Sequence, residues 1–128
     1  MYKEILPISI TEQCPPEAAY QPSSLEVYRL VSQFPPTIND FSSHYALGKS
    51  PTHSPIDLCK WASCSVFKSG ENGINLKKLP KIKNKSVVVK LVLGVDSGKV
   101  MEGKNNHFDF WIYKTFNAVN GSSFFCNI

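Results

Sequence analysis

The chain has 128 residues, of which 42% are hydrophobic and 12% aromatic, and its formal net charge is +4. This composition is too apolar for a disordered segment and suffices for the core of one domain. No apolar run approaches the roughly 20 residues of a membrane-spanning helix, and residues 1–7 lack the pattern of a secretory signal. We therefore expect a cytoplasmic protein without a membrane segment, whose cysteines are thiols; the alternative is a secreted protein with disulfides.

The positive charge is concentrated in residues 77–90, which contain six lysines and no acidic residue. The rest of the chain is therefore net negative. A single-stranded nucleic-acid interface would place aromatic side chains among such lysines to stack on bases, and this stretch has none. We interpret these lysines as protection of a valine-rich strand against edge pairing, and we expect no nucleic-acid partner. The lysines are Lys77, Lys78, Lys81, Lys83, Lys85 and Lys90.

The N-terminal residues 1–24 are expected to wrap the surface of the core or to dock as an edge strand. Residues 5–10 favour an extended conformation, and the prolines that follow limit any helix to about two turns. Residues 25–31 then alternate with period two, which predicts a strand with Arg29 between Val27 and Val31 on one face. Tyr28 and Leu30 would face the other way. A helix over these residues is the competing interpretation.

Two short helices are predicted next. Thr37 and Asp40 have the spacing of a capping box, and a helix from Thr37 would end at Gly48. Its inward-facing residues would be Ile38, Phe41, Tyr45 and Leu47. A second start signal, with Ser54 as the cap, proline at the first position and an acid at the third, predicts a helix that ends near Trp61. A third, brief helix is predicted over residues 74–79.

The remaining predicted elements are strands over residues 63–67, 86–93 and 107–113, with a short returning segment at 99–102. The stretch 86–93 is the longest β-branched apolar run, and it predicts a central strand that needs cover on both faces. Its residues would alternate, with Val87, Val89, Leu91 and Leu93 on one face and Val88, Lys90 and Val92 on the other.

In the last predicted strand, His107, Asp109, Trp111 and Tyr113 share one face, and Phe108, Phe110 and Ile112 share the other. The whole pattern predicts a single α+β domain over residues 1–128. We expect a twisted, mainly antiparallel sheet with short helices packed on one face.

Metal and cysteine chemistry are weakly indicated. His53, Cys59 and Cys64 could supply three zinc ligands, with His44, Cys14 or Cys126 as a fourth, but structural zinc sites use more closely spaced pairs. We expect no metal. A cysteine nucleophile, Cys64 or Cys126, would need a histidine beside it, and no spacing identifies one.

Arg29, Ser65 and His107, each on a predicted strand, form the candidate site. Arg29 is the sole arginine of the chain, and its guanidinium is a flat, permanently charged fork that suits a phosphate. The alternative is structural: Arg29 would form a salt bridge, Ser65 would bond to the backbone, and His107 would be a surface residue of its strand.

The order of these elements resembles the ADP-ribosyltransferase-like fold, which small toxins of the RES type use in a minimal form. Residues 27–30, Val-Tyr-Arg-Leu, are similar to the first strand of that fold, and residues 64–67, Cys-Ser-Val-Phe, to its second motif strand. Three further patterns are similar to short uncharacterised bacterial reading frames: Asp-Phe at 40–41, Ser-Val-Phe at 65–67 and His-x-x-Phe-Trp at 107–111.

The resemblance implies that NAD is the cofactor, with Arg29 holding its phosphates and Ser65 contacting the nicotinamide ribose. Ser65 and His107 are then the catalytic candidates. The family's third motif supplies a glutamate near the last core strand, whereas this chain offers His107 and Asp109 there, with Glu102 one loop earlier. The implied activity is that of an NAD-dependent ADP-ribosyltransferase or NAD glycohydrolase in a bacterial or phage conflict system, of the toxin–antitoxin or defence type.

A second functional hypothesis belongs to a different class. The chain would be a non-catalytic module that binds a protein partner, such as an antitoxin, immunity or anti-defence protein, or a second copy of itself. Exposed aromatic residues, Trp61, Phe108 or Phe110, would form its surface. The enzyme hypothesis requires Arg29 and the other candidates to meet in one cleft, and the binding hypothesis requires a flat apolar patch.

Overall fold

The valine-rich segment forms strand β3 (Val87–Leu93) in the computed structural model, which describes residues 1–7, 13–50, 57–71 and 85–128. It pairs with β1 (Leu25–Val31) along one edge and with β6 (Ser123–Asn127) along the other. The strand order of the sheet is β4-β5-β2-β1-β3-β6, and every pairing is antiparallel. The predicted α+β fold is confirmed. β3 has two neighbours, as expected, but it lies next to an edge of the sheet.

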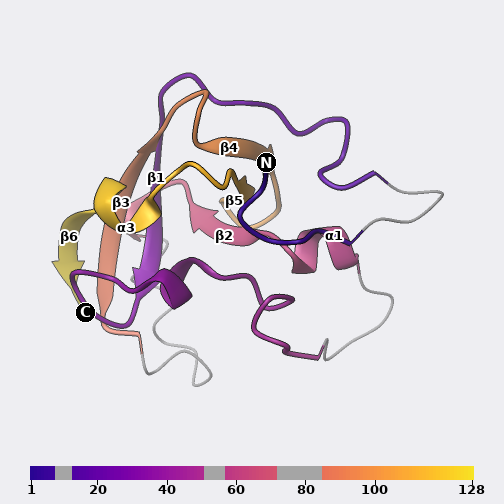
Figure 1. The fold of residues 1–128 in the computed structure, drawn as a ribbon. Coiled ribbons are helices and arrows are strands. Elements are labelled where there is room, and N and C mark those ends of the chain that lie inside the picture. The colour runs from indigo at the N-terminus through magenta and orange to yellow at the C-terminus, as the bar shows by residue number, and fades with distance from the viewer. Residues whose placement is uncertain (8–12, 51–56, 72–84) are drawn as a thin grey trace.

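The other half of the sheet consists of β2 (Cys64–Phe67), β5 (His107–Ile112) and β4 (Gly98–Glu102). It joins the first half through a short contact, because β1 and β2 are in register only at Tyr28 and Phe67, whereas β1 and β3 are aligned from Leu25 to Val31. In Figure 1, β2 runs across the direction of β1 and β3. The sheet therefore opens between β1 and β2.

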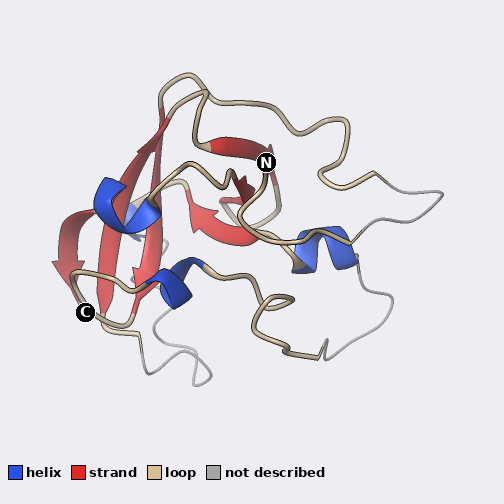
Figure 2. Cartoon of the chain, viewed as in Figure 1, coloured by secondary structure: helices blue, strands red, loops and turns tan. Residues whose placement is uncertain are grey.

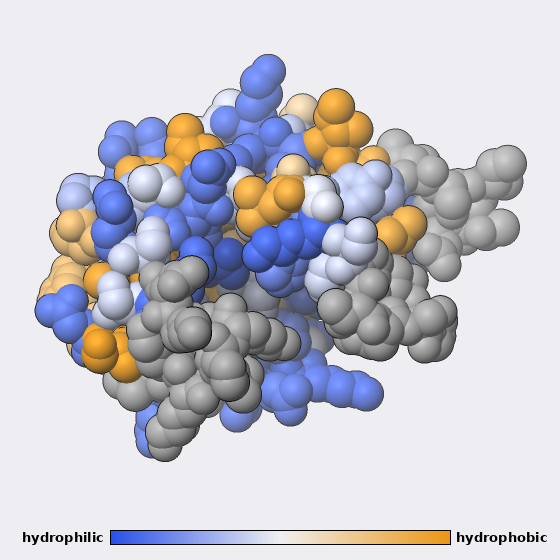
Figure 3. Space-filling view, turned by 90° about the horizontal axis from the view of Figure 1, so that it is seen from below, coloured by the Kyte–Doolittle hydropathy of each residue, from blue (hydrophilic) through white to orange (hydrophobic). Residues whose placement is uncertain are grey.

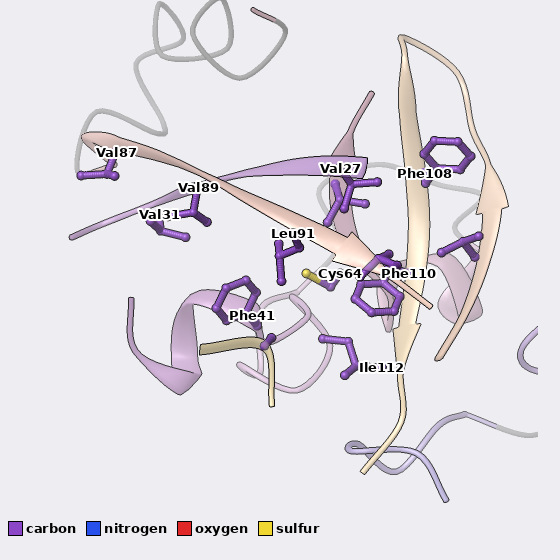
Figure 4. Packing of buried hydrophobic residues seen from close by; sticks show 14 residues of the cluster. Val27, Val31, Phe41, Cys64, Val87, Val89, Leu91, Phe108, Phe110 and Ile112 are labelled. Carbon is purple, nitrogen blue, oxygen red and sulfur yellow. The ribbon is translucent and has the colours of Figure 1, made fainter. Parts of the chain in front are cut away.

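Three short helices complete the structure: η1 (Ile38–Phe41, a 3-10 helix), α1 (Leu58–Trp61) and α3 (Ala118–Gly121). Figure 2 shows η1 and α3 on the side of β1 and β3, and α1 beyond β2. Phe41 of η1 and Ala118 of α3 belong to the main hydrophobic core, which fills one face of the sheet (Figure 4). That core consists of Val27, Val31, Phe41, Cys64, Val66, Val87, Val89, Leu91, Leu93, Val100, Phe108, Phe110, Ile112 and Ala118.

The opposite face is covered in two places. Tyr28, Leu30 and Val88 form a small cluster on the β1–β3 half. On the β5–β4 half, Trp111 packs with α1 and with the N-terminal segment, and its indole Nε1 donates a hydrogen bond to the Cys59 carbonyl oxygen at 3.0 Å. Tyr2 bridges to Tyr113 and Tyr20 bridges to Val100, so the N-terminal segment extends the sheet at these points.

The predicted side-chain alternation is confirmed in the strands. Val27 and Val31 lie in the main core, while Tyr28 and Leu30 lie in the cluster on the other face, which excludes the helical interpretation of residues 25–31. In β3 and β5, too, alternate side chains point to the two faces of the sheet as predicted. Alternation was sufficient here because each strand is covered differently on its two sides.

The prediction of a helix from Thr37 to Gly48 was wrong beyond its first turn. η1 ends at Phe41, and Ile38, Tyr45 and Leu47 are exposed instead of buried. Ser43 explains the stop, because its amide and hydroxyl donate hydrogen bonds to the Glu4 carboxylate while its hydroxyl oxygen accepts one from the amide of Ala46. A serine that bonds to local backbone in this way competes with the helix.

The helix predicted to end near Trp61 does end there, and one strand, β6, was not expected. α1 begins after Asp57, whose carboxylate accepts a hydrogen bond from the amide of Lys60, so Asp57 is the N-cap of this helix. β6 was not predicted, because its exposed residues do not alternate. The expected caps at 54–55 and helix at 74–79 lie outside the described residues.

The expectation that all four cysteines are thiols was wrong. Cys14 and Cys59 form a disulfide, whereas Cys64 and Cys126 are free. The prediction of thiols depended on the lack of a secretory signal pattern. No spacing in the sequence identifies Cys14 and Cys59 as partners, because 45 residues separate them. The disulfide ties the N-terminal segment to α1. Among the described residues, no helix is both long and apolar enough to cross a membrane.

Because the disulfide closes a loop of this length, its loss is expected to reduce the free energy of unfolding by about 4 kcal/mol. The variant Cys14→Ser/Cys59→Ser should show this loss in urea unfolding, and the variant Cys126→Ser should not. In denaturant without reductant, a thiol-alkylating reagent should label Cys64 and Cys126 only. Labelling of Cys14 or Cys59 would contradict this assignment.

Candidate functional site

A cavity of about 260 Å³ lies where η1, α1, β2 and β5 meet, beside the opening between β1 and β2. Arg29, Ser65 and His107 all line this cavity, so the structure brings the three predicted site residues together. We refer to it as the Arg29 cavity. Its lining consists of Arg29, Asn39, Ser42, His44, Leu47, Lys49, Lys60, Ser63, Ser65, Lys85, His107 and Asp109.

Arg29 connects the two halves of the sheet at the point where β1 and β2 separate. Its Nε donates a hydrogen bond to the Asp40 carbonyl oxygen at 2.9 Å, and its Nη1 donates one to the Ser65 carbonyl oxygen at 2.6 Å. The guanidinium thus replaces ladder hydrogen bonds that β1 and β2 do not form. A guanidinium has five N–H donors, so three remain for other partners. No carboxylate of the described residues pairs with Arg29, contrary to the structural alternative.

Asp40 holds η1 against the end of β1. Its buried carboxylate accepts hydrogen bonds from the Thr37 amide at 2.8 Å and the Ser32 amide at 3.1 Å, and it pairs with Lys85 at 3.3 Å. Burial alone would raise the pKa of Asp40, but these hydrogen bonds and the lysine outweigh it and hold the pKa below its usual value. The predicted capping box is therefore confirmed, and Asp40 also places the carbonyl oxygen that Arg29 binds.

Ser65 lies directly opposite Asp109 in the β2–β5 ladder. Cross-strand partners point to the same face, with their Cβ atoms roughly 5 Å apart. The Ser65 hydroxyl forms no hydrogen bond with the described residues; it is the Ser65 carbonyl oxygen that is occupied, by Arg29. The register therefore places a free hydroxyl beside a carboxylate in the wall of the Arg29 cavity.

Asp109 is a buried carboxylate with poor partners. The residue is 5% exposed. Its Oδ1 is 3.3 Å from the Ser63 hydroxyl, but that hydroxyl has a shorter hydrogen bond, of 2.7 Å, to the Lys60 carbonyl oxygen. Its Oδ2 is buried and has no hydrogen-bond partner in the described part of the chain. Burial of a carboxylate costs free energy unless hydrogen bonds and opposite charges compensate it, so Asp109 is poorly explained as a structural residue.

His107 supports Asp109 from the same face of β5. Its Nε2 lies 3.5 Å from Oδ1 of Asp109, and its Nδ1 contacts the Lys104 carbonyl oxygen. Gly103 packs against the ring, because a Cβ there would lie 2.7 Å from Nε2. Both ring nitrogens therefore face oxygen atoms, and this geometry fits a residue that positions Asp109 better than a free general base.

The Arg29 cavity is rich in positive charge. Lys49, Lys60 and Lys85 line it together with Arg29, and Asp109 is its only carboxylate among the described residues. Most of the described surface is hydrophilic in the view of Figure 3, with hydrophobic residues in separate spots. Anions are attracted to a hollow with this lining. Lys49 and Lys60 were not among the sequence candidates, because neither stands in a recognisable motif.

The other sequence candidates are not assembled into a site. Burial raises the pKa of the Cys64 thiol, which the positive charge of Arg29 offsets in part, so Cys64 is a core thiol. Cys59 is in the disulfide, and His53 lies outside the described residues. His44 stacks on Trp61 at 4.6 Å. No group of three histidine, cysteine, aspartate or glutamate side chains is placed to hold a metal within the described ranges.

No family model, curated protein or solved structure matches this chain. The resemblance to ADP-ribosyltransferase-like toxins therefore stays a prediction from the sequence. The chemistry of the Arg29 cavity has to be argued from its own residues.

The role of Asp40 predicts a pH-dependent stability. Folding lowers the pKa of Asp40. The ionised carboxylate therefore contributes fully to the free energy of unfolding above pH ~4, and this contribution is lost as the pH falls through the pKa of the folded state. We expect Asp40→Asn to reduce the free energy of unfolding by about 2 kcal/mol at pH 7, since it places an amide among backbone donors. Urea unfolding should show this deficit narrowing towards pH ~3.

The matched control is Asp96→Asn, which alters an exposed aspartate whose side chain forms no hydrogen bond or ion pair with the residues that the structure describes. Its stability should follow that of the original protein at both pH values. An Asp40→Asn deficit that stays constant with pH would show that the carboxylate charge is not what stabilises η1.

Proposed function

We propose that the Arg29 cavity binds a phosphate-bearing nucleotide, with NAD as the first candidate, and hydrolyses its bond to nicotinamide. The observation that carries this proposal is the buried, poorly paired carboxylate of Asp109 in a cavity that is otherwise cationic. A buried carboxylate with few partners lowers the stability of the folded protein, and such groups are expected where function requires them.

The cationic side chains support the phosphate part of the ligand. Arg29 retains three N–H donors after its two backbone hydrogen bonds, and an arginine held by such bonds presents its free edge in a fixed direction. Charge-assisted hydrogen bonds from a guanidinium to phosphate are among the strongest in proteins. Lys49 and Lys60 add attraction without fixed geometry.

Asp109 and Ser65 support the sugar part of the ligand. Oδ2 of Asp109 lacks a donor, and the Ser65 hydroxyl beside it lacks a partner among the described residues. A ribose has hydroxyl groups that donate to the former and accept from the latter. Cations, a carboxylate and a free hydroxyl in one cavity match the two chemical parts of a nucleotide.

The proposed reaction breaks the bond between C1′ of the ribose and the nicotinamide nitrogen, and the bonding electrons leave with nicotinamide. Water adds to C1′, and its proton passes to Asp109 and then to solvent, which leaves ADP-ribose. The carboxylate of Asp109 stabilises the positive charge that develops on the sugar, in place of the glutamate of the family that the chain resembles. Ser65 contacts the ribose, and His107 positions Asp109.

The size of the cavity limits what it encloses. At about 260 Å³ it is slightly smaller than the roughly 300–1,000 Å³ of most small-molecule sites. It suits the nicotinamide ribose and its phosphate, so the adenosine half of NAD would lie outside it.

The proposed setting is a bacterial or phage conflict system, with the protein in the cytoplasm. One observation weighs against the cytoplasm: disulfides such as Cys14–Cys59 persist in oxidising compartments. Alkylation of free thiols as the protein is recovered from cells, before any purification, tests whether the Cys14–Cys59 disulfide forms in the compartment where the protein resides.

The alternative, a non-catalytic protein-binding module, requires a different surface from the one that we predicted. Phe108 is 7% and Phe110 1% exposed, so neither offers a binding surface, and the indole of Trp61 donates to the Lys49 carbonyl oxygen. Phe124 and Phe125 on β6 are nearly half exposed and would form such a surface instead. Loss of partner binding in Phe124→Ser/Phe125→Ser, with the cavity variants unaffected, would favour this alternative.

The central test of the proposed activity compares two variants with the unaltered protein in a nicotinamide-release assay with NAD. Asp109→Asn should lower the rate at least ~100-fold, because it removes the charge that stabilises the transition state. The same change should leave the melting temperature unchanged or raise it, since it removes a poorly compensated buried charge. Asp96→Asn, the surface control, should change neither quantity.

Arg29→Lys and Gly103→Ala separate binding from positioning. Arg29→Lys should mainly weaken NAD binding, because lysine lacks the fixed fork. Gly103→Ala should push the His107 ring away from Asp109 and lower kcat with little effect on KM. Absence of nicotinamide release and of any NAD-induced thermal shift in the unaltered protein would end the proposal.

A further inference from the structure

A second cavity lies on the other side of η1 from the Arg29 cavity. Its volume is about 330 Å³, which is within the range of small-molecule sites. Ile38 lines this cavity and its neighbour Asn39 lines the other one, so η1 is the wall between them. We refer to it as the Lys3 cavity. Its lining consists of Lys3, Ile38, Phe41, Ile112, Lys114, Thr115, Phe116, Asn117, Ala118 and Val119.

The inner wall of the Lys3 cavity is apolar and belongs to the main core. Phe41 is 1% exposed, and Ile112 and Ala118 are also buried. Phe116 and Val119 pack against the same core, and the ring of Phe116 lies edge-on to Phe110. A wall held by the core in this way keeps its shape without a ligand. Ile38, by contrast, is 66% exposed, which leaves a large apolar side chain in contact with water beside the hollow.

The rim of the Lys3 cavity is cationic. Lys3 and Lys114 follow Tyr2 and Tyr113, which form a β-bridge with their rings 5.3 Å apart. Both lysines line the cavity.

Backbone hydrogen bonds fix the positions of both lysines. The Lys3 amide donates to the Ile112 carbonyl oxygen at 2.8 Å, and the Lys114 amide donates to the Met1 carbonyl oxygen. Neither ammonium group takes part in an ion pair with a described residue, and no described acidic residue lines the cavity. Two like charges held at one rim without a counter-charge favour an anionic group there.

We propose that the Lys3 cavity binds a small amphipathic carboxylate, with its apolar body against Phe41, Ile112 and Phe116. Its carboxylate lies between Lys3 and Lys114. This ligand class follows from the two halves of the lining, since an apolar molecule without charge would leave the ammonium groups unpaired and a polar anion would leave the apolar wall in water. The site is separate from the Arg29 cavity, and the inference does not rest on the proposed NAD chemistry.

The test uses octanoate as the probe, titrated into the full chain and followed by amide NMR, with octylammonium as the probe of opposite charge. Octanoate is expected to shift the amides of Ile112, Phe116 and Val119, and octylammonium is expected to leave them unchanged. The variant Lys3→Gln/Lys114→Gln should weaken octanoate binding about tenfold or more and should keep its fold, because the two residues bond through backbone atoms. The matched control is Lys99→Gln/Lys104→Gln, which removes two lysines outside this lining and should bind octanoate as the original protein does.

Three results would overturn the proposal: octanoate causes no shift, octylammonium shifts the same amides equally, or the Lys3→Gln/Lys114→Gln variant binds octanoate unchanged. Shifts centred on β6 and its exposed Phe124 would also overturn it, because they would indicate general adhesion of an alkyl chain to exposed aromatic rings. Circular dichroism of both variants establishes that any loss of binding is not a loss of folding.

Discussion

The hydrogen bonds of the Arg29 guanidinium are the interaction on which the candidate site depends. β1 and β2 share a single register position, and the opening between them would leave the carbonyl oxygen of Ser65 without a strand partner. Arg29 binds that oxygen from β1 and the Asp40 carbonyl oxygen at the same time, so η1, β1 and β2 meet at one side chain. The Asp40 carboxylate holds η1 in place by accepting hydrogen bonds from the Thr37 and Ser32 amides and by pairing with Lys85. Without this arrangement the cavity would lose its cationic wall.

Asp109 differs from Asp40, because it is poorly stabilised by its surroundings. In an ordinary buried ion pair the hydrogen bonds and the opposite charge offset desolvation, as they do for Asp40. Among the described residues, Asp109 has a shared hydroxyl, an imidazole at 3.5 Å and one oxygen without a partner. The contrast between the two aspartates within one small domain is what separates a structural carboxylate from a functional candidate. It is also the reason that the proposed chemistry is assigned to Asp109 and not to His107.

Much of the strand structure could be predicted from the sequence. In residues 25–31, 87–93 and 107–112 the side chains alternate in character, because the two faces of each strand pack against different surroundings. The three candidates Arg29, Ser65 and His107 were found from residue chemistry and element order, and they line one cavity. The helix after Thr37 could not be predicted correctly, since Ser43 bonds to Glu4, which is distant in sequence. The Cys14–Cys59 pair and the importance of Asp109 were beyond the sequence for the same reason: both depend on which segments the fold brings into contact.

The role of Arg29 can be tested most directly by NMR. Because Arg29 is the sole arginine of the chain, its Nε–H gives one assignable signal. That signal should exchange slowly with water, because Nε donates to a backbone carbonyl oxygen. Titration with ADP-ribose should shift it together with the amides of Ser65 and Asp109, while the amides of β6 stay unchanged. A rapidly exchanging Nε–H that ADP-ribose leaves in place would contradict the claim that Arg29 both joins the sheet and holds the phosphate.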